Sequence, residues 1–186
     1  MTKVAGEDLC ELVAAASGLA CTVLRTSRFF PEGDDSEEVS AEYDDANAKV
    51  NELLYRRVDI ADVVDAHVAA MGVSPTSGFA KYVLSATTPF QMNDVTELRA
   101  NAPAVVKRLF PTYEEIYGSL GWRMFSRIDR VYVNTRARAG LDWAPRFGFQ
   151  QALQCLSAGV EWRSPLAVAI GAKGYHPDTE GPYTVR

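Results

Sequence analysis

Arginine is the residue type whose number and spacing in this chain most favour ligand binding. From Arg99 to Arg146 the basic residues outnumber the acidic ones, although the 186-residue chain carries a formal net charge of −5. A guanidinium group presents a planar fork of donors that matches the oxygens of a phosphate group. This basic excess therefore favours recognition of phosphate near a pocket. The run from Glu32 to Asp45 holds eight acidic residues and no basic one, which indicates a solvated loop before a helix.

The other residue types that often carry chemistry are less well placed. His67 falls in the middle of a predicted helix, which favours a packed or half-buried structural histidine over a catalytic one. His176 has no second histidine or cysteine nearby, so we expect no metal site. The three cysteines, Cys10, Cys21 and Cys155, lack the CxxC spacing of zinc and redox sites, and we interpret them as buried free thiols.

The composition is that of an ordinary globular protein of one domain, with 47% hydrophobic and 23% charged residues. No stretch reaches the roughly 18 consecutive apolar residues that a membrane helix needs, and the first residues lack the pattern of a secretory signal. The acidic net charge argues against a nucleic-acid partner, because binding to phosphates needs a basic face. We therefore expect a cytoplasmic protein with no membrane or nucleic-acid partner.

Helices and strands alternate along the sequence, which predicts an α/β fold. Apolar residues at helical spacing predict a helix over the first residues that stops at Gly18, and short buried strands are predicted at 21–24 and 81–86. A free-standing parallel sheet usually has four or more strands, and an amphipathic helix at the start of the chain needs a sheet face to cover. The sequence therefore predicts that part of the sheet is missing upstream.

Capping residues predict further helices. Asp59 precedes a helix that ends at Gly72, Asp94 and Asn101 precede two short helices, and Thr112 with Glu115 predicts a capping box for another. Helices are also expected around 46–54, from Asn134 to about Gly140, and over 149–156. The segment 130–133 is expected to be extended, and the tail after Gly159 irregular.

Four segments, which begin at Thr2, Val23, Tyr55 and Asn134, can be compared with known motifs. In sequence order they resemble motifs of the extended short-chain dehydrogenases/reductases, the family of NAD-dependent epimerases and dehydratases. The opening Thr2-Lys3-Val-Ala-Gly resembles the segment that begins with the family's Tyr-x-x-x-Lys motif, and Lys3 stands at the position of the lysine. The motif's tyrosine would lie four residues earlier, ahead of Met1. Residues 23–31, Val-Leu-Arg-Thr-Ser-Arg-Phe-Phe-Pro, resemble a strand and loop that carry Leu-Arg-x-x-Asn, with Arg28 where asparagine is usual.

The two remaining matches lie further along the chain. Residues 55–68, Tyr-Arg-Arg-Val-Asp-Ile-Ala-Asp-Val-Val-Asp-Ala-His-Val, resemble the family's basic residue, short strand and Asp-Val-Ala-x-Ala-His helix. Residues 134–145 resemble its closing Lys-Ala-x-x-x-Leu-Gly-Trp-x-Pro signature. Together the matches cover residues 2 to about 157, and their order makes the set more specific than any one of them.

The resemblance implies an α/β fold that is the C-terminal portion of a Rossmann-type protein, with a small, mainly helical substrate lobe. The sequence contains neither G-x-G-x-x-G nor G-x-x-G-x-x-G, so the glycine-rich half that holds the dinucleotide is absent. The implied organisation is a single incomplete domain over 1–186. Residues 1–35 would end the Rossmann-like sheet, 36–157 would form mostly the substrate lobe, and 158–186 would be an irregular tail.

The resemblance also implies the functional residues. Lys3 would be the catalytic lysine, without its tyrosine, and would bind NAD or NADP together with Arg28. The implied substrate-binding residues are Arg28, Phe29, Phe30, Arg56, Arg57, Arg127 and Arg130, whose arginines would contact the diphosphate of a nucleotide-sugar-like substrate. The residues alone leave other interpretations open: a surface lysine at 3, core packing of the two phenylalanines, and a solvated arginine pair at 56–57 that closes a helix.

Two hypotheses about function follow. In the first, the chain is a truncated NAD(P)-dependent oxidoreductase of the epimerase/dehydratase family, inactive alone because its tyrosine and glycine-rich loop are absent. In the second, it is a non-catalytic module that binds a ligand or partner through the same lobe. The expected partners are a nucleotide-sugar-like small molecule and either an N-terminal cofactor-binding half or a second copy of the chain.

Overall fold

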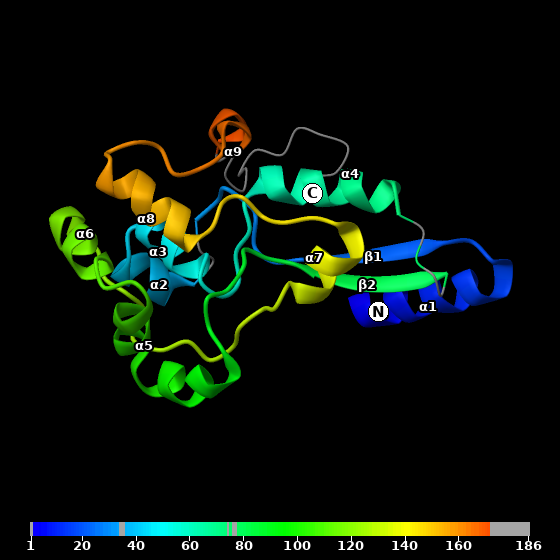
Figure 1. Ribbon diagram of the computed structural model, residues 1–186, viewed down its shortest axis with the longest axis horizontal. Coiled ribbons are helices and arrows are strands. Elements are labelled where there is room, and N and C mark those ends of the chain that lie inside the picture. The colour runs from blue at the N-terminus through cyan, green and yellow to red at the C-terminus, as the bar shows by residue number, and fades with distance from the viewer. Residues whose placement is uncertain (1, 34–35, 74, 76–77, 172–186) are drawn as a thin grey trace.

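Two parallel strands lie between helices, as the alternating sequence pattern predicts. The computed structural model describes residues 2–33, 36–73, 75 and 78–171. Its elements are α1 (Lys3–Ser17), β1 (Cys21–Thr26), α2 (Glu37–Glu42), α3 (Asp45–Glu52), α4 (Ile60–Met71), β2 (Phe79–Leu84), η1 (Met92–Asp94), α5 (Val95–Leu109), α6 (Tyr113–Leu120), α7 (Thr135–Leu141), α8 (Phe149–Ser157) and α9 (Pro165–Ile170) (Figure 1). The fold is therefore mixed α/β with a small parallel sheet.

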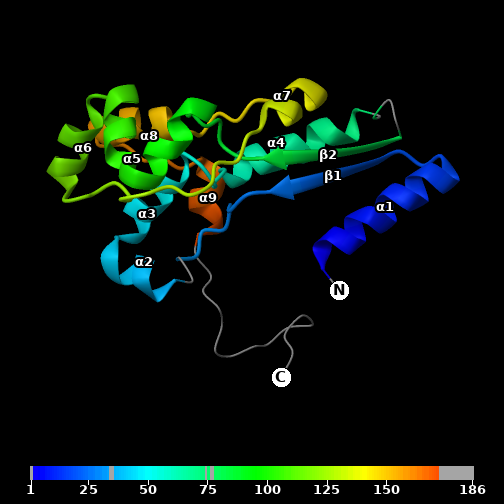
Figure 2. The ribbon, with the colours of Figure 1, turned by 90° about the horizontal axis from the view of Figure 1, so that it is seen from below.

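The sheet consists of β1 and β2 in parallel register, from Cys21 opposite Phe79 to Thr26 opposite Leu84. Alternate residues of a strand face opposite sides. Leu24, Tyr82 and Leu84 pack on one side with residues of α4 and α7. Figure 2 shows α1 on the other side of the strands. The sheet is thus covered on both faces, as parallel sheets usually are.

The helix α1 turns its polar side to the sheet. Glu7 accepts hydrogen bonds from the Arg25 guanidinium at 2.9 and 3.1 Å, and Ala14 is the buried residue of the helix. In contrast, the apolar Leu9, Leu12 and Val13, which predict the helix, are 58%, 65% and 46% exposed. The sequence predicts that this apolar stripe packs on a sheet. It does not pack on β1 and β2, because the stripe lies on the side of α1 that faces away from them.

A second core lies in the helical cluster at the opposite end of the molecule (Figure 1). It is formed by buried side chains of α3, α5, α6 and α8, with others from the connecting segments; among them are Val50, Leu53, Leu54, Val105, Val106, Tyr117 and Leu153. Tyr117 donates from its hydroxyl to Asn51 Oδ1 at 2.8 Å, which satisfies its polar atom within this core.

Several predicted boundaries are confirmed. Gly18 ends α1 in the left-handed conformation with φ of 72°, and the Asp59 carboxylate accepts the Ala61 N–H at 2.8 Å at the start of α4. Backbone angles at Asn101 are not helical and divide α5, where Asn101 Oδ1 accepts the Ala104 N–H at 3.3 Å. These residues cap or stop helices because their side chains or backbone satisfy the unpaired groups at helix ends.

Other local predictions are wrong. Thr112 precedes α6 but its side chain makes no capping hydrogen bond. Asn134 precedes α7, yet its amide donates to Ser85 O at 2.9 Å instead of capping the helix. At Asn134, a tertiary partner takes the place of the local cap.

The expected irregular tail contains a helix. Ser164 precedes α9, and its hydroxyl accepts the Ala167 N–H at 3.0 Å. Pro165 stands at the first helical position, where its missing N–H costs nothing. A serine followed by proline is a known pattern for the start of a helix, so this helix could have been predicted from the sequence. His176 and the rest of the tail beyond Gly171 lie outside the described residues.

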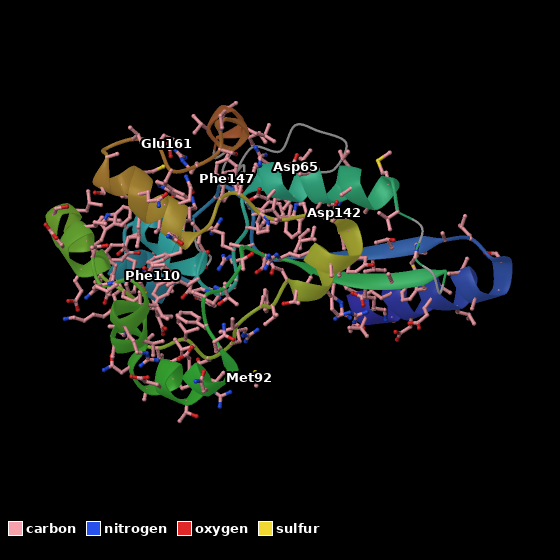
Figure 3. The ribbon with its side chains drawn as sticks, viewed as in Figure 1. Asp65, Met92, Phe110, Asp142, Phe147 and Glu161 are labelled. Atoms are coloured by element: carbon pink, nitrogen blue, oxygen red, sulfur yellow. The ribbon has the colours of Figure 1, made fainter. Side chains whose placement is uncertain are left out.

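A buried carboxylate attaches the loop before α8 to α4. Asp62 on α4 accepts the N–H groups of Arg146 at 2.9 Å and Phe147 at 3.0 Å. Trp143 Nε1 donates to Asp62 O at 3.0 Å. Figure 3 shows Phe147 in this loop near the start of α4. Burial raises the pKa of Asp62 to about 6, although its two backbone N–H donors act in the opposite direction.

The Asp62→Asn substitution should change how stability depends on pH. Because the pKa of Asp62 is higher in the folded than in the unfolded chain, folding takes up protons between about pH 4 and pH 6, and stability falls as pH rises through this window. The substitution removes this term. We expect the unfolding free energy of the wild type to drop by about 2–3 kcal/mol relative to the variant between pH 4 and pH 7.

Equilibrium urea unfolding at several pH values measures this difference. Asp65→Asn, on the exposed side of the same helix, is the matched control for loss of one carboxylate. Parallel pH profiles for the wild type and Asp62→Asn would show that the carboxylate is not perturbed by burial.

Candidate functional site

An open hollow of about 790 Å³ lies at the carboxyl end of β1. Ligands of open α/β sheets bind at the carboxyl ends of parallel strands, because the loops that follow the strands meet there. The residues that line this hollow are Lys3, Thr26, Ser27, Arg28, Phe29, Phe30, Glu32, Gly33, Ser36 and Arg57. They come from the first turn of α1, the end of β1 with the loop that follows it, and the segment between α3 and α4.

The hollow brings together part of the predicted site. Lys3, Arg28, Phe29, Phe30 and Arg57 all line it, although up to 54 positions separate them along the chain. Arg56 is adjacent to Arg57 but does not line the hollow. Arg127 and Arg130 lie exposed in the loop between α6 and α7, and neither lines it.

One buried carboxylate holds three of the predicted arginines. Glu52, with a side chain only 1% exposed, lies 2.7 Å from Arg57 Nε, 2.7 Å from Arg56 and 3.3 Å from Arg28. Arg57 is itself buried and also donates to Phe30 O at 2.9 Å. Of the charged residues that line the hollow, Lys3, Arg28 and Arg57 are basic and Glu32 is acidic, so basic residues are in excess there. Arg57 clamps the loop, whereas the side chains of Arg28 and Arg56 remain partly exposed.

The two phenylalanines have different surroundings. Their rings stack with centroids 4.2 Å apart, and Phe30 is 62% exposed, so core packing does not explain its position. Phe29 is half-buried. Both also line a neighbouring cavity of about 40 Å³ under α9. This cavity holds a few water molecules at most, so the open hollow is the larger ligand space.

Ser27 is a residue of this site that sequence reasoning missed. It is 5% exposed, it lines the hollow, and its hydroxyl has no hydrogen-bond partner among the described residues. A buried hydroxyl without a partner costs free energy, and in native proteins it usually has one. Its position shortly after the predicted strand, where the chain leaves the sheet, could have indicated Ser27 as a site residue.

Lys3 lies at the start of α1 and is exposed. The first turn of α1 has no acidic residue, and Thr2 makes no side-chain capping bond. The partial positive charge of a helix N-terminus therefore adds to the charge of Lys3. Together with the arginine cluster, this end of α1 makes the hollow favourable for an anionic ligand.

The remaining chemistry-bearing residues do not form a site of this kind. Among the described residues, no group of three or more histidine, cysteine or acidic side chains is placed to hold a metal ion. His67 is exposed on α4, rather than packed, with Nδ1 2.8 Å from Val63 O. The interpretation of the cysteines as buried is also wrong, since Cys10 is exposed and Cys21 and Cys155 are half-buried.

No protein-family model matches the chain, and no curated protein matches it. Among solved structures it is similar to RMD from Pseudomonas aeruginosa, described in its complex with NADPH. The TM-score is 0.45 with 16% sequence identity, over 84% of this chain and 52% of that one, so the chain spans about half the length of that protein. Within the part that the structure describes, no helix has the length and apolar character needed to cross a bilayer.

The Glu52→Gln substitution should strongly destabilise the fold. Without the carboxylate, the buried guanidinium of Arg57 has lost its charged partner, and such a change typically costs about 3–5 kcal/mol. The control is Glu97→Gln, which removes an exposed partner of Arg108 and should cost less than about 1 kcal/mol. Urea unfolding compares the two. Equal losses would show that Glu52 does not organise the arginines as described.

Proposed function

We propose that this chain is the substrate-binding part of an NAD(P)-dependent oxidoreductase of the epimerase/dehydratase kind, and that its substrate resembles a nucleotide sugar. The observation that carries the proposal is the hollow at the carboxyl end of β1. Three sequence segments that resemble the family's motifs contribute to it: the start of α1 with Lys3, the segment 23–31, and the segment 55–57. They are far apart in the sequence and come together where an α/β protein binds its ligand.

The lining residues supply the interactions that such a substrate requires. Arg28 and Lys3 provide positive charge for a diphosphate, and the exposed ring of Phe30 provides an apolar face for a sugar or base. The hydroxyl of Ser27 is an unsatisfied hydrogen-bonding group at the same place. Arg57 contributes indirectly, because it fixes Phe30 through the carbonyl and balances Glu52.

The fit to a nicotinamide dinucleotide is partial. Lys3 and Arg28, which line the hollow, would contact the nicotinamide-ribose end, but the sequence offers no glycine-rich loop for the pyrophosphate. The cofactor, when bound, would accept or donate hydride. The residues that line the hollow include no tyrosine, so the family's proton-transfer group is not among them. We therefore assign this chain substrate binding and not turnover by itself.

We also propose that a dinucleotide-binding half packs against α1 and β1. Among the described residues, β2 is the strand that pairs with β1, and the other edge of β1 pairs with no named strand. Such an edge presents N–H and C=O groups that another strand satisfies. The helix α1 contacts both strands, and the apolar Leu9, Leu12 and Val13 are exposed on its outer side. A polypeptide that supplies both a strand and an apolar surface would cover them together.

The alternative function is a non-catalytic module, and the absence of tyrosine among the residues that line the hollow favours it. The two functions differ in one outcome. Addition of a dinucleotide-binding half from a related enzyme should give NADPH binding and turnover if the chain belongs to an oxidoreductase. Ligand binding without turnover in that mixture would support the module.

Substitution of Arg28 should weaken ligand binding. Loss of a charge-assisted hydrogen bond costs about 1.5–3 kcal/mol, so we expect Arg28→Ala to weaken the binding of UDP or a UDP-sugar about 10- to 150-fold. Ser27→Ala should weaken it less. Arg127→Ala, which removes an exposed arginine outside the hollow, is the matched control and should leave the affinity unchanged.

Isothermal titration calorimetry of the full chain measures these affinities. Wild-type protein that binds neither UDP nor a UDP-sugar at millimolar concentration would end the proposal of a nucleotide-sugar site. An equal loss in Arg28→Ala and Arg127→Ala would place the ligand elsewhere.

The exposed stripe of α1 should make the isolated chain associate. Each Å² of apolar surface removed from water contributes about 25 cal/mol, so a few hundred Å² left exposed favour association by several kcal/mol. We expect oligomers in sedimentation velocity, and fewer of them in a Leu9→Lys/Leu12→Lys variant. Val160→Lys, at an apolar residue of similar exposure elsewhere, is the control. A wild-type chain that sediments as a monomer at all concentrations would contradict an interface on α1.

A further inference from the structure

Cys10 lies on the side of α1 that faces the sheet. It follows Glu7 by three residues and precedes Ala14 by four, and this spacing places all three on one side of a helix. Glu7 pairs with Arg25 of β1, and Ala14 is the buried residue of α1. The Cys10 thiol is therefore directed toward β1, although its residue is exposed at the margin of the contact.

Cys21 is the first residue of β1 and lies on the side of the sheet that faces α1. Alternation along the strand puts Cys21 on the same side as Arg25, which reaches Glu7 on α1. The chain reverses between the two cysteines at Gly18, whose φ of 72° is left-handed. Burial raises the pKa of the Cys21 thiol, and the Cys10 thiol acts on this pKa in the same direction. The third cysteine, Cys155, lies on α8 in the helical cluster.

We propose that Cys10 and Cys21 form a reversible dithiol–disulfide pair that links α1 to β1. The oxidant is a low-molecular-weight disulfide. The Cys10 sulfur, as the exposed one, attacks this disulfide, forms a mixed disulfide and displaces the first small thiol. The Cys21 sulfur then attacks Cys10 and displaces the second. Two protein thiols are oxidised, the reagent's S–S bond is reduced, and the two protons leave with the two small thiols.

A disulfide between Cys10 and Cys21 would matter because α1 is only weakly attached to the sheet. Ala14 is the one buried residue among those of α1, and the Glu7–Arg25 pair is partly exposed, which makes such a pair contribute little. A disulfide restricts the chain between the two cysteines and holds the helix on the strand. Lys3, which lines the hollow, lies on the same helix. Oxidation would therefore fix the position of one wall of the candidate site.

The test is incubation of the full chain with oxidised glutathione, followed by thiol counting and peptide mass mapping. We expect the wild type to lose two of its three thiols and to yield one cross-linked peptide pair that contains Cys10 and Cys21. Dithiothreitol should restore all thiols. Cys155→Ser, the matched control, should form the same link, while Cys10→Ser should not form it.

Hydrogen exchange separates this pair from incidental oxidation. The amides of α1 should exchange at least several-fold more slowly in the oxidised chain than in the reduced chain. A stable glutathione adduct on Cys10 without the link, a link to Cys155, a disulfide between two chains, or three unreacted thiols would each overturn the proposal.

Discussion

The carboxylate of Glu52 is the group on which the arrangement of the candidate site depends. Glu52 is the last residue of α3, in the helical cluster. Its carboxylate pairs with Arg28, which follows β1, and with Arg57, which precedes α4. Beside it, Arg28 N donates to Arg56 O at 3.0 Å, and Val58 N donates to Arg28 O at 3.0 Å. Ala86 N, just after β2, donates to Arg57 O at 2.8 Å. The segment at 57 therefore lies between the ends of both strands and joins the two cores.

This junction also sets the electrostatics of the hollow. A buried carboxylate is stable only when it is paired and hydrogen-bonded, and Glu52 meets that condition with three guanidiniums. The same arrangement leaves more positive than negative charge beside an open space. Arg57 is the most deeply buried of the three arginines, while the side chains of Arg28 and Arg56 are 30% and 29% exposed, and of these two Arg28 lines the hollow. Burial thus distinguishes Arg57, which holds the loop after β1, from Arg28, whose side chain is partly exposed in the hollow.

Sequence patterns predict what depends on neighbours along the chain. Helix periodicity, the glycine at 18 and the aspartate at 59 give α1 and α4 correctly, because a cap or a stop acts within a few residues. They do not reveal which side of α1 meets the sheet, since that choice rests on Glu7 and Arg25, 18 positions apart. The same holds for Asn134, which bonds to Ser85 rather than capping α7. The family resemblance assigns Arg127 and Arg130 to the substrate site together with the other arginines. They lie instead in the loop between α6 and α7, outside the hollow.

The orientation of α1 connects the fold to its proposed partner. In a self-sufficient α/β layer, the apolar stripe of a helix packs on the sheet and the polar side faces water. Here Lys81 on β2 and Arg25 on β1 meet Glu7 and Glu11 on the inner side of α1. Leu9 and Leu12 face away. Ion pairs at a partly exposed contact stabilise the attachment of α1 only weakly. Exposed leucines favour association, so burial of the outer side would stabilise this arrangement. The helix is therefore better suited to lie between two layers than to cover one.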